Sequence, residues 1–165
     1  MINQLREAFP QIEVDCLTTI NDKHTFVFED EKAVFVSDKD KHHLHIENKT
    51  NAEFYFIQND DCVMKTEKGG QCDYVICNNQ SIYFTEIKVA TGNFPNHRKD
   101  AYSQLENTYK YYSNLIDFST IENLNALVCF PSPRRIVKAS ASTKRKEFKV
   151  KYRLNLQEGN YIAFE

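Results

Sequence analysis

The sequence lacks the features that mark membrane and secreted proteins. No apolar run approaches the roughly 18 residues that a membrane span requires. The first residues contain an acid and no apolar stretch of the kind found in a signal peptide. We therefore expect a cytoplasmic protein with no membrane partner. Tryptophan is absent, but hydrophobic residues make up 41% of the 165 residues, so the sequence predicts a single folded domain over residues 1–165.

The sequence also lacks any Cys-x-x-Cys pair. A zinc site built from cysteines needs such paired spacing, so we expect no site of this kind. The number of cysteines is odd, and together with the expected cytoplasmic location this favours reduced, mostly buried thiols. The five are Cys16, Cys62, Cys72, Cys77 and Cys129.

The net charge of −2 hides a strongly basic segment between Arg134 and Arg153. Nine basic residues there face a single acid, so the segment carries +8 and the rest of the chain −10. Such a split indicates a polyanionic partner such as nucleic acid. The alternative is a solvated helix face. The residues of this segment that we expect to touch nucleic acid are Arg134, Arg135, Lys144, Arg145 and Lys146.

Short hydrophobic segments separated by polar clusters dominate the N-terminal third of the chain. They predict an antiparallel β-meander, preceded by a short amphipathic helix over residues 2–9. The predicted strands cover residues 25–28, 33–36, 43–46 and 53–57. His43 and His45 share one face of the third of these strands. They form either a metal-binding His-x-His pair or part of an exposed polar strand.

Strand and helix patterns both occur in the rest of the chain. Alternation of apolar residues predicts a hairpin after Gly69-Gly70, and the period then changes to the 3.6 residues typical of a helix. These patterns indicate a fold that contains both helices and sheets. The predicted elements are a hairpin over 71–77 and 81–89, a long helix over 97–116, a buried strand over 124–130, a partly helical basic segment and a last strand over 160–164.

Two acids and a lysine are predicted to share one face of the hairpin. If Asn79 and Gln80 are the central residues of the turn, Asp73 lies opposite Glu86, and Lys88 follows on the same face. Like charges directly opposite destabilise a sheet, and a divalent cation between the two carboxylates would remove the conflict. The lysine would then orient a water nucleophile or stabilise a phosphorane-like transition state. The alternative is a surface salt-bridge cluster on an edge hairpin.

With these residues, the chain resembles the PD-(D/E)XK nuclease superfamily. The signature of that family is an acid on one strand, (D/E)-x-K on the next strand and a helix that packs on the sheet. Here it is Asp73, then Glu86-Ile87-Lys88, then the predicted long helix. The helix carries Ala101 and Gln104-Leu105-Glu106-Asn107-Thr108, which is similar to small bacterial members. The resemblance covers residues 43–130, and the proline of the family's name is absent because Cys72 precedes Asp73.

The resemblance implies an α/β fold of the α+β type. Its restriction-endonuclease-like core would be a central mixed β-sheet flanked by helices, to which the N-terminal antiparallel meander is added. It also implies a Mg²⁺- or Mn²⁺-dependent nuclease that acts on DNA, in defence or repair. The metal ligands would be Asp73, Glu86 and the carbonyl of Ile87. Lys88 would be the catalytic lysine, and Gln104 would approach the site or the nucleic acid from the helix.

The family also has an upstream acid, which would complete the metal site. Three residues are candidates by position: Asp60, Asp61 and Glu7. We favour Asp60 as a metal ligand, because related small members keep an Asp-x-Cys sequence there.

The start of the long helix adds two cations to the nucleic-acid candidates. Arg98 and Lys99 either touch phosphate or form a solvated first turn. The tyrosines of the same helix either stack on bases or, as we favour, belong to the core; they are Tyr102, Tyr109, Tyr111 and Tyr112. The rival to an enzyme is a catalytically inactive nuclease-like module that binds nucleic acid or a protein partner. A homodimer or a partner protein is plausible, because a chain of this length has little room for a recognition domain.

Overall fold

The computed structural model describes residues 1–30, 33–37, 41–50, 52–65, 69–89, 92–130 and 142–165. Its helices are α1 (Ile2–Ala8), α2 (Phe94–Ser113) and α3 (Ser142–Tyr152), and two short π-helical segments are η1 (Ile12–Cys16) and η2 (Asn59–Val63). Its strands are β1 (Leu17–Ile20), β2 (His24–Glu29), β3 (Ala33–Val36), β4 (Leu44–Asn48), β5 (Phe54–Gln58), β6 (Tyr74–Cys77), β7 (Ser81–Ile87), β8 (Asn123–Cys129), β9 (Asn155–Glu158) and β10 (Tyr161–Phe164). None of the described helices is long and apolar enough to span a membrane.

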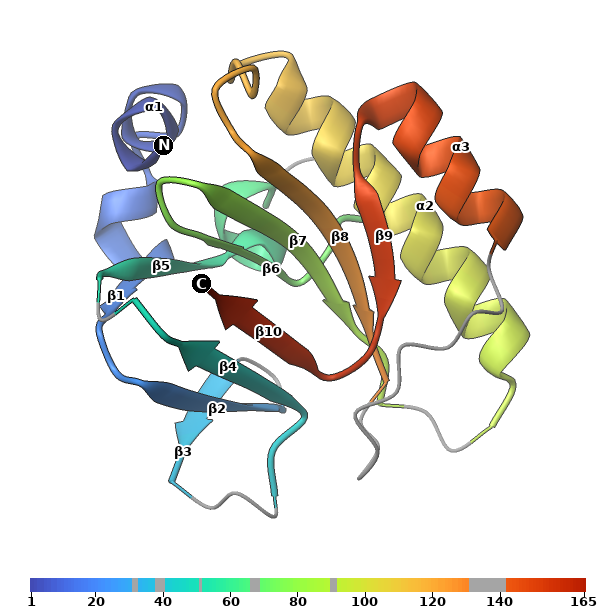
Figure 1. Cartoon of the computed structure of the whole chain (residues 1–165), viewed down its shortest axis with the longest axis horizontal. Helices are drawn as coiled ribbons and strands as arrows, with labels where there is room; N and C mark the ends of the chain where they lie inside the picture. Colours follow the sequence, from blue (N-terminus) through green and yellow to red (C-terminus); the bar gives the residue numbers. More distant parts are fainter. Residues whose placement is uncertain (31–32, 38–40, 51, 66–68, 90–91, 131–141) are drawn as a thin grey trace.

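The strands form two mixed sheets that are stacked with the helices in layers (Figure 1). A six-stranded sheet has the order β1-β5-β6-β7-β8-β9, and a four-stranded sheet has the order β10-β4-β2-β3. One buried cluster joins the helices to the six-stranded sheet through residues such as Leu5, Leu105 and Phe148. A second cluster joins the two sheets through residues such as Val27 and Ile76. The α/β fold class is therefore confirmed, and each face of the larger sheet is covered.

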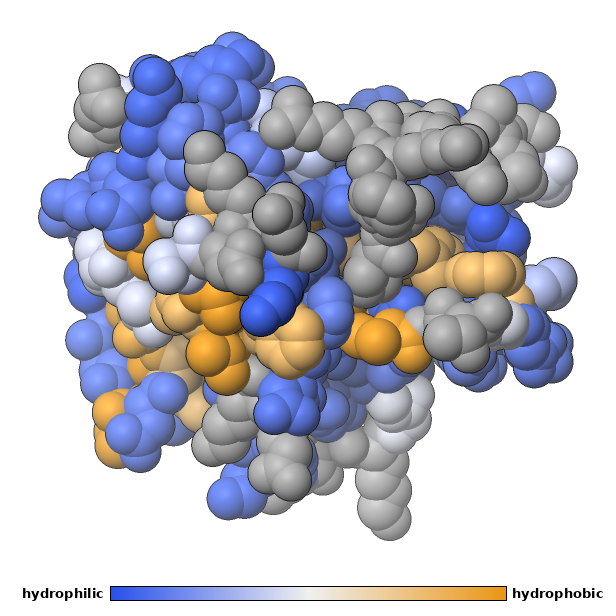
Figure 2. Space-filling model, turned by 90° about the horizontal axis from the view of Figure 1, so that it is seen from below, coloured by the Kyte–Doolittle hydropathy of each residue, from blue (hydrophilic) through white to orange (hydrophobic). Residues whose placement is uncertain are grey.

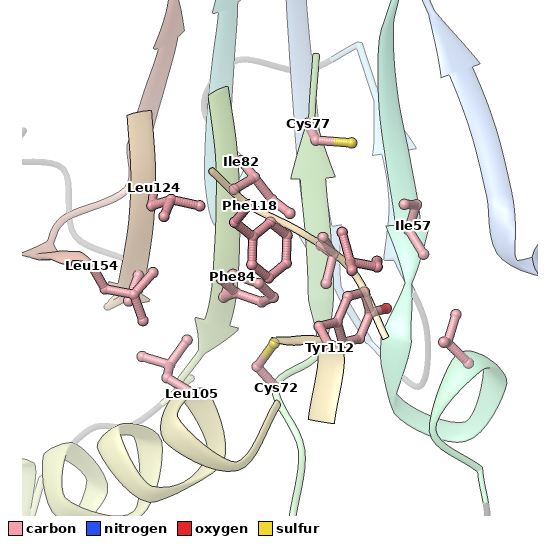
Figure 3. Packing of buried hydrophobic residues seen from close by; sticks show 14 of the residues in the cluster. Ile57, Cys72, Cys77, Ile82, Phe84, Leu105, Tyr112, Phe118, Leu124 and Leu154 are labelled. Carbon is pink, nitrogen blue, oxygen red and sulfur yellow. The ribbon is translucent and has the colours of Figure 1, made fainter. Parts of the chain in front are cut away.

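The central hairpin of β6 and β7 has the register that the sequence predicts. Val75 pairs with Phe84, and Cys77 pairs with Ile82. The side chain of Asn78 fixes the turn, because its Oδ1 accepts hydrogen bonds from the amides of Gln80 (2.9 Å) and Ser81 (2.8 Å). Figure 3 shows Cys77, Ile82 and Phe84 on the same side of the sheet as Leu105 and Tyr112 of α2. The tyrosine Tyr112 is fully buried, as expected of a core residue.

The predicted N-terminal meander is wrong as a single unit. Its first three strands, β2 to β4, form the four-stranded sheet, whereas β5 pairs with β6 in the six-stranded sheet. The last strand, β10, completes the smaller sheet by running parallel to β4. Alternating residues indicate a strand with two different faces, but they carry no information about which sheet receives it. The strands β1 and β9 were not predicted, because each has few apolar residues.

The long helix and the next strand are shifted from their predicted bounds. The helix α2 covers 94–113 instead of 97–116, with Pro95 in its first turn, where a missing N–H costs nothing. The strand β8 covers 123–129 instead of 124–130. These shifts leave the site residues on the elements that were predicted to carry them.

The histidines of the smaller sheet are packed in an aromatic layer. His45 is 7% exposed, its Nε2 atom lies 3.2 Å from Nδ1 of His24, and its ring stacks on Phe26. His43 stacks on Phe28, and its Nδ1 accepts a hydrogen bond from the amide of Glu29 (3.0 Å). The interpretation of this strand as an exposed polar strand is therefore wrong for His45.

Two of the five cysteines form a disulfide, so the prediction that all thiols are reduced is wrong. Cys16 at the end of η1 is bonded to Cys62 in η2. The other three, Cys72, Cys77 and Cys129, are free and buried, as predicted. The pairing follows from the packing of η1 against η2, and the 46-residue separation of the two cysteines leaves no sign of it in the sequence.

We expect the disulfide to contribute to stability, because it closes a long loop in the unfolded chain. Replacing both Cys16 and Cys62 with serine should lower the free energy of unfolding by about 2–4 kcal/mol. Urea denaturation under non-reducing conditions measures the change. Reductant should lower the stability of the wild type to a similar extent and leave the double variant unchanged. A double variant as stable as the oxidised wild type would contradict the prediction.

Candidate functional site

The predicted acids lie at one edge of the six-stranded sheet, where β6 begins and β7 ends. Asp73 immediately precedes β6, and Glu86 is the penultimate residue of β7. Oδ2 of Asp73 accepts a hydrogen bond from the amide of Ile87 (2.6 Å), and Oε2 of Glu86 accepts one from the amide of Asp73 (3.2 Å). Each carboxylate is therefore held by backbone next to the other, and the predicted pairing of the two acids is confirmed.

Lys88 and Gln104 complete this group from β7 and α2. Nζ of Lys88 lies 2.5 Å from Oε1 of Glu86 and donates a hydrogen bond to Oε1 of Gln104 (2.8 Å). The side-chain Nε2 of Gln104 donates a hydrogen bond to the carbonyl of Gln71 (3.1 Å). A Cβ added at Gly70 would lie 3.3 Å from Cγ of Gln104, and Gly70 has a φ of +77°. A glycine at this position thus lets the chain pass close to the glutamine that holds the lysine.

Burial disfavours the charged forms of both acids. The side chain of Glu86 is 1% exposed, and its burial raises the pKa to about 7 despite the opposing effect of Lys88. Burial also raises the pKa of Asp73 to about 8, and the charge of Glu86 adds to this. Lys88 is the cation that opposes the two carboxylates in both cases. Ionisation of both acids would therefore place more negative charge here than Lys88 neutralises, and a divalent cation would offset this excess.

Of the three candidates for the upstream acid, Asp60 is the one linked to this group. Its Oδ1 accepts a hydrogen bond from Nε2 of Gln71 (2.6 Å), and its charge contributes to the raised pKa of Glu86. The amide of Asn59, one residue earlier in η2, donates to the carbonyl of Asp73 (2.8 Å). Asp61 and Glu7 are exposed, and no contact to the acid pair is found for either among the described residues.

Sequence reasoning missed a further acid, Glu29, at the end of β2. The hydroxyl of Tyr74 donates a hydrogen bond to Oε2 of Glu29. The charge of Glu29 contributes to the raised pKa of Asp73, and the charge of Asp60 contributes to the raised pKa of Glu29. In the sequence Glu29 lies in an acidic stretch between two predicted strands, which is typical of a hairpin turn. The alternation of Thr25 and Val27, which both face inward, places it on the buried side and could have identified it.

The donors at this edge suit a hard cation, although the site is sparse. Carboxylate oxygens are the ligands that Mg²⁺ and Mn²⁺ prefer, and Asp73, Glu86 and Asp60 supply them together with the carbonyl of Ile87. Oδ1 of Asp73 makes no hydrogen bond to a described residue. Within the described ranges, however, no three His, Cys, Asp or Glu residues lie close enough to hold a metal ion together. The residues fit a cation bound by two acids and completed by water or phosphate oxygens.

The predicted nucleic-acid contacts lie in different environments. Lys99 and Lys146 are exposed. Arg98 is paired with Glu158 of β9, and Lys144 with Glu147. Arg145 is partly buried. Arg134 and Arg135 lie outside the described residues. Figure 2 shows the molecule from below the view of Figure 1, and on this face hydrophobic residues are interspersed with hydrophilic ones.

The chain has no match among the protein-family models, the curated proteins or the solved structures with which it was compared. Its function is therefore inferred from the geometry of the site.

Proposed function

We propose that this protein is a Mg²⁺- or Mn²⁺-dependent nuclease that hydrolyses phosphodiester bonds of DNA. The observation that carries the proposal is the buried pair of Asp73 and Glu86, with Lys88 held against it by Gln104. The same residues form the signature of the PD-(D/E)XK family in the sequence. We also propose that the β6–β7 hairpin, α2 and the parallel strand β8 correspond to a restriction-endonuclease-like core. A role in defence or repair would fit this activity.

The residues of the chain have distinct roles in this proposal. Asp73, Glu86 and the carbonyl of Ile87 would hold the divalent cation, and Asp60 would reach it through a water molecule. When bound, the cation would supply Lewis-acid activation of the phosphate and of the attacking water. Lys88 is held by Gln104 beside Glu86, where its ammonium offsets the charge that develops on the phosphate oxygens. Because the pKa values of both acids are raised, binding of a cation would release protons from them.

The proposal is tested by cleavage of plasmid and single-stranded DNA. Wild-type protein should cut in the presence of Mg²⁺ or Mn²⁺ and be inactive in a chelator, and the Lys88→Ala variant should lose the activity. Equal activity in both proteins, or no activity in either across substrates and metals, would contradict the proposal.

A second candidate is a catalytically inactive module that binds nucleic acid or a protein partner. It is favoured by one observation: no group of three metal-ligating side chains is assembled within the described ranges. Binding of DNA without cleavage, at every divalent cation tried, would support this candidate. A homodimer or partner protein is compatible with either function.

A further inference from the structure

A second buried carboxylate, Glu158, lies in the same row of the sheet as Glu86. Val128 of β8 is the register partner of Glu86 on one side and of Glu158 on the other. Residues in register on parallel strands point to the same face, so both acids lie on the face covered by α2. Two strand spacings separate them by about 10 Å. The C-terminal ends of β7, β8 and β9 thus bring both acids to one edge (Figure 1).

Glu158 holds a guanidinium in place. Nε of Arg98 donates to both oxygens of Glu158, at 3.0 and 3.1 Å, and the hydroxyl of Tyr102 donates to Oε1 at 2.7 Å. The guanidinium also lies over the ring of Phe130, 5.4 Å from its centroid. The carboxylate and the ring together fix the plane of the guanidinium. The side chain of Glu158 is only 4% exposed, so the carboxylate itself is buried.

The rest of the arginine is available to a ligand. Its two terminal NH₂ groups make no hydrogen bond to the described residues, and its side chain is 26% exposed. Arg145 of α3 adds positive charge near Tyr102. A guanidinium whose plane is fixed and whose outer N–H groups are available matches the geometry of a phosphate.

We propose that Arg98 binds a backbone phosphate of the nucleic acid, one or two nucleotides from the cleaved bond, and that Glu158 and Tyr102 position its guanidinium. The spacing follows from the row of the sheet, because successive phosphates of one strand lie about 6–7 Å apart in space, so that about 10 Å spans one or two nucleotides. The position relative to the cleaved bond rests on the proposed function, whereas the phosphate contact does not.

The contact is tested by the binding of a fluorescent single-stranded DNA to Lys88→Ala protein, which the proposed function makes inactive. Adding Arg98→Gln should weaken binding by roughly tenfold and lower the slope of log affinity against log salt by about one. Adding Arg98→Lys keeps the charge but not the fork, so it should weaken binding without changing the slope. The matched control is Lys110→Gln, which removes an exposed cation from the same helix that is already paired with Glu106.

The role of Glu158 is tested by whether Glu158→Gln weakens or tightens the binding of DNA. If charge alone mattered, Glu158→Gln would tighten binding by removing an acid; if Glu158 positions Arg98, the variant weakens binding. Tyr102→Phe should weaken it too, and thermal denaturation shows whether each variant is folded. Should Glu158→Gln fail to fold, Tyr102→Phe and Arg98→Lys decide the question. Tighter binding by Glu158→Gln, or wild-type affinity in Arg98→Gln, would overturn the proposal.

A neutral methylphosphonate placed at successive positions of the substrate tests the spacing. Wild-type protein should lose affinity when the modification lies one or two nucleotides from the cleaved bond, and Arg98→Gln should be insensitive there. Sensitivity confined to other positions would overturn the spacing. A wild type that binds through Arg98 but never cuts would contradict the proposed function and leave the phosphate contact standing. If the wild type cuts DNA and neither binding nor cleavage depends on Arg98, the proposed function stands and the phosphate contact is contradicted.

Discussion

Replacing Lys88 with alanine should lower the rate of DNA cleavage by about 10²–10³-fold, as expected for the loss of one group that stabilises transition-state charge. The ammonium is held at 2.5 Å from Glu86 and at 2.8 Å from Gln104, so its position is fixed before substrate binds. Single-turnover cleavage measures the loss, because it isolates the chemical step from product release.

Two comparisons separate this role from a structural one. Lys88→Met keeps the length of the side chain, so it should fold like the wild type while remaining as inactive as Lys88→Ala. Lys110→Ala removes an exposed lysine of α2 and should cut at the wild-type rate. If Lys88→Met retained most of the activity, the lysine would serve to neutralise Glu86 and not to stabilise the transition state.

Replacing Asp73 with asparagine should abolish cleavage and, without metal, make the protein more stable at alkaline pH. Burial and the charge of Glu86 raise the pKa of Asp73 from 3.8 to about 8. A group whose pKa is raised on folding stabilises the protein fully below its unfolded pKa, and this stability is lost as pH rises through the folded pKa. The wild type should therefore lose stability between about pH 4 and about pH 8.

Asparagine carries no charge at any of these pH values, so the variant escapes this loss. Above pH 8 it should exceed the wild type by about 1–3 kcal/mol, whereas below about pH 4 the two should be similar, because Asp73 is then protonated in both the folded and the unfolded state. Chemical denaturation in a chelator at both pH values measures the difference. At alkaline pH, adding Mg²⁺ or Mn²⁺ should raise the stability of the wild type but not that of the Asp73→Asn variant. A variant less stable than the wild type at alkaline pH would contradict the assignment of Asp73 as an uncompensated acid.

The acid pair was predictable from the sequence because its determinants are local. A two-residue turn set by Asn78 fixes the hairpin register, and the register places Asp73 beside Glu86. Lys88 follows from the alternation of side chains along the strand. The link of Gln104 to Lys88 needed only the packing of the next helix on the hairpin.

Other parts of the site depend on contacts between distant segments, and the sequence carries no local sign of them. Glu158 can be buried because Arg98 and Tyr102 of α2 hydrogen-bond to it. The sequence of β9 alone is mostly polar and does not indicate a buried strand. Glu29 belongs to the second sheet and reaches the first through Tyr74. The disulfide depends on the packing of η1 against η2. In each case a polar or reactive residue is placed by tertiary structure and not by periodicity.

The parallel pairing of β4 with β10 has a consequence for how the chain folds. It places His45 against Tyr161, so the smaller sheet cannot be completed until segments far apart in the sequence have met. Closing so long a loop costs entropy before its contacts compensate, and contacts of this kind slow folding. The hairpin of β6 and β7 is local, so we expect it to form early. During refolding, one apolar face of the larger sheet is therefore exposed for a time, and losses to aggregation should rise with protein concentration.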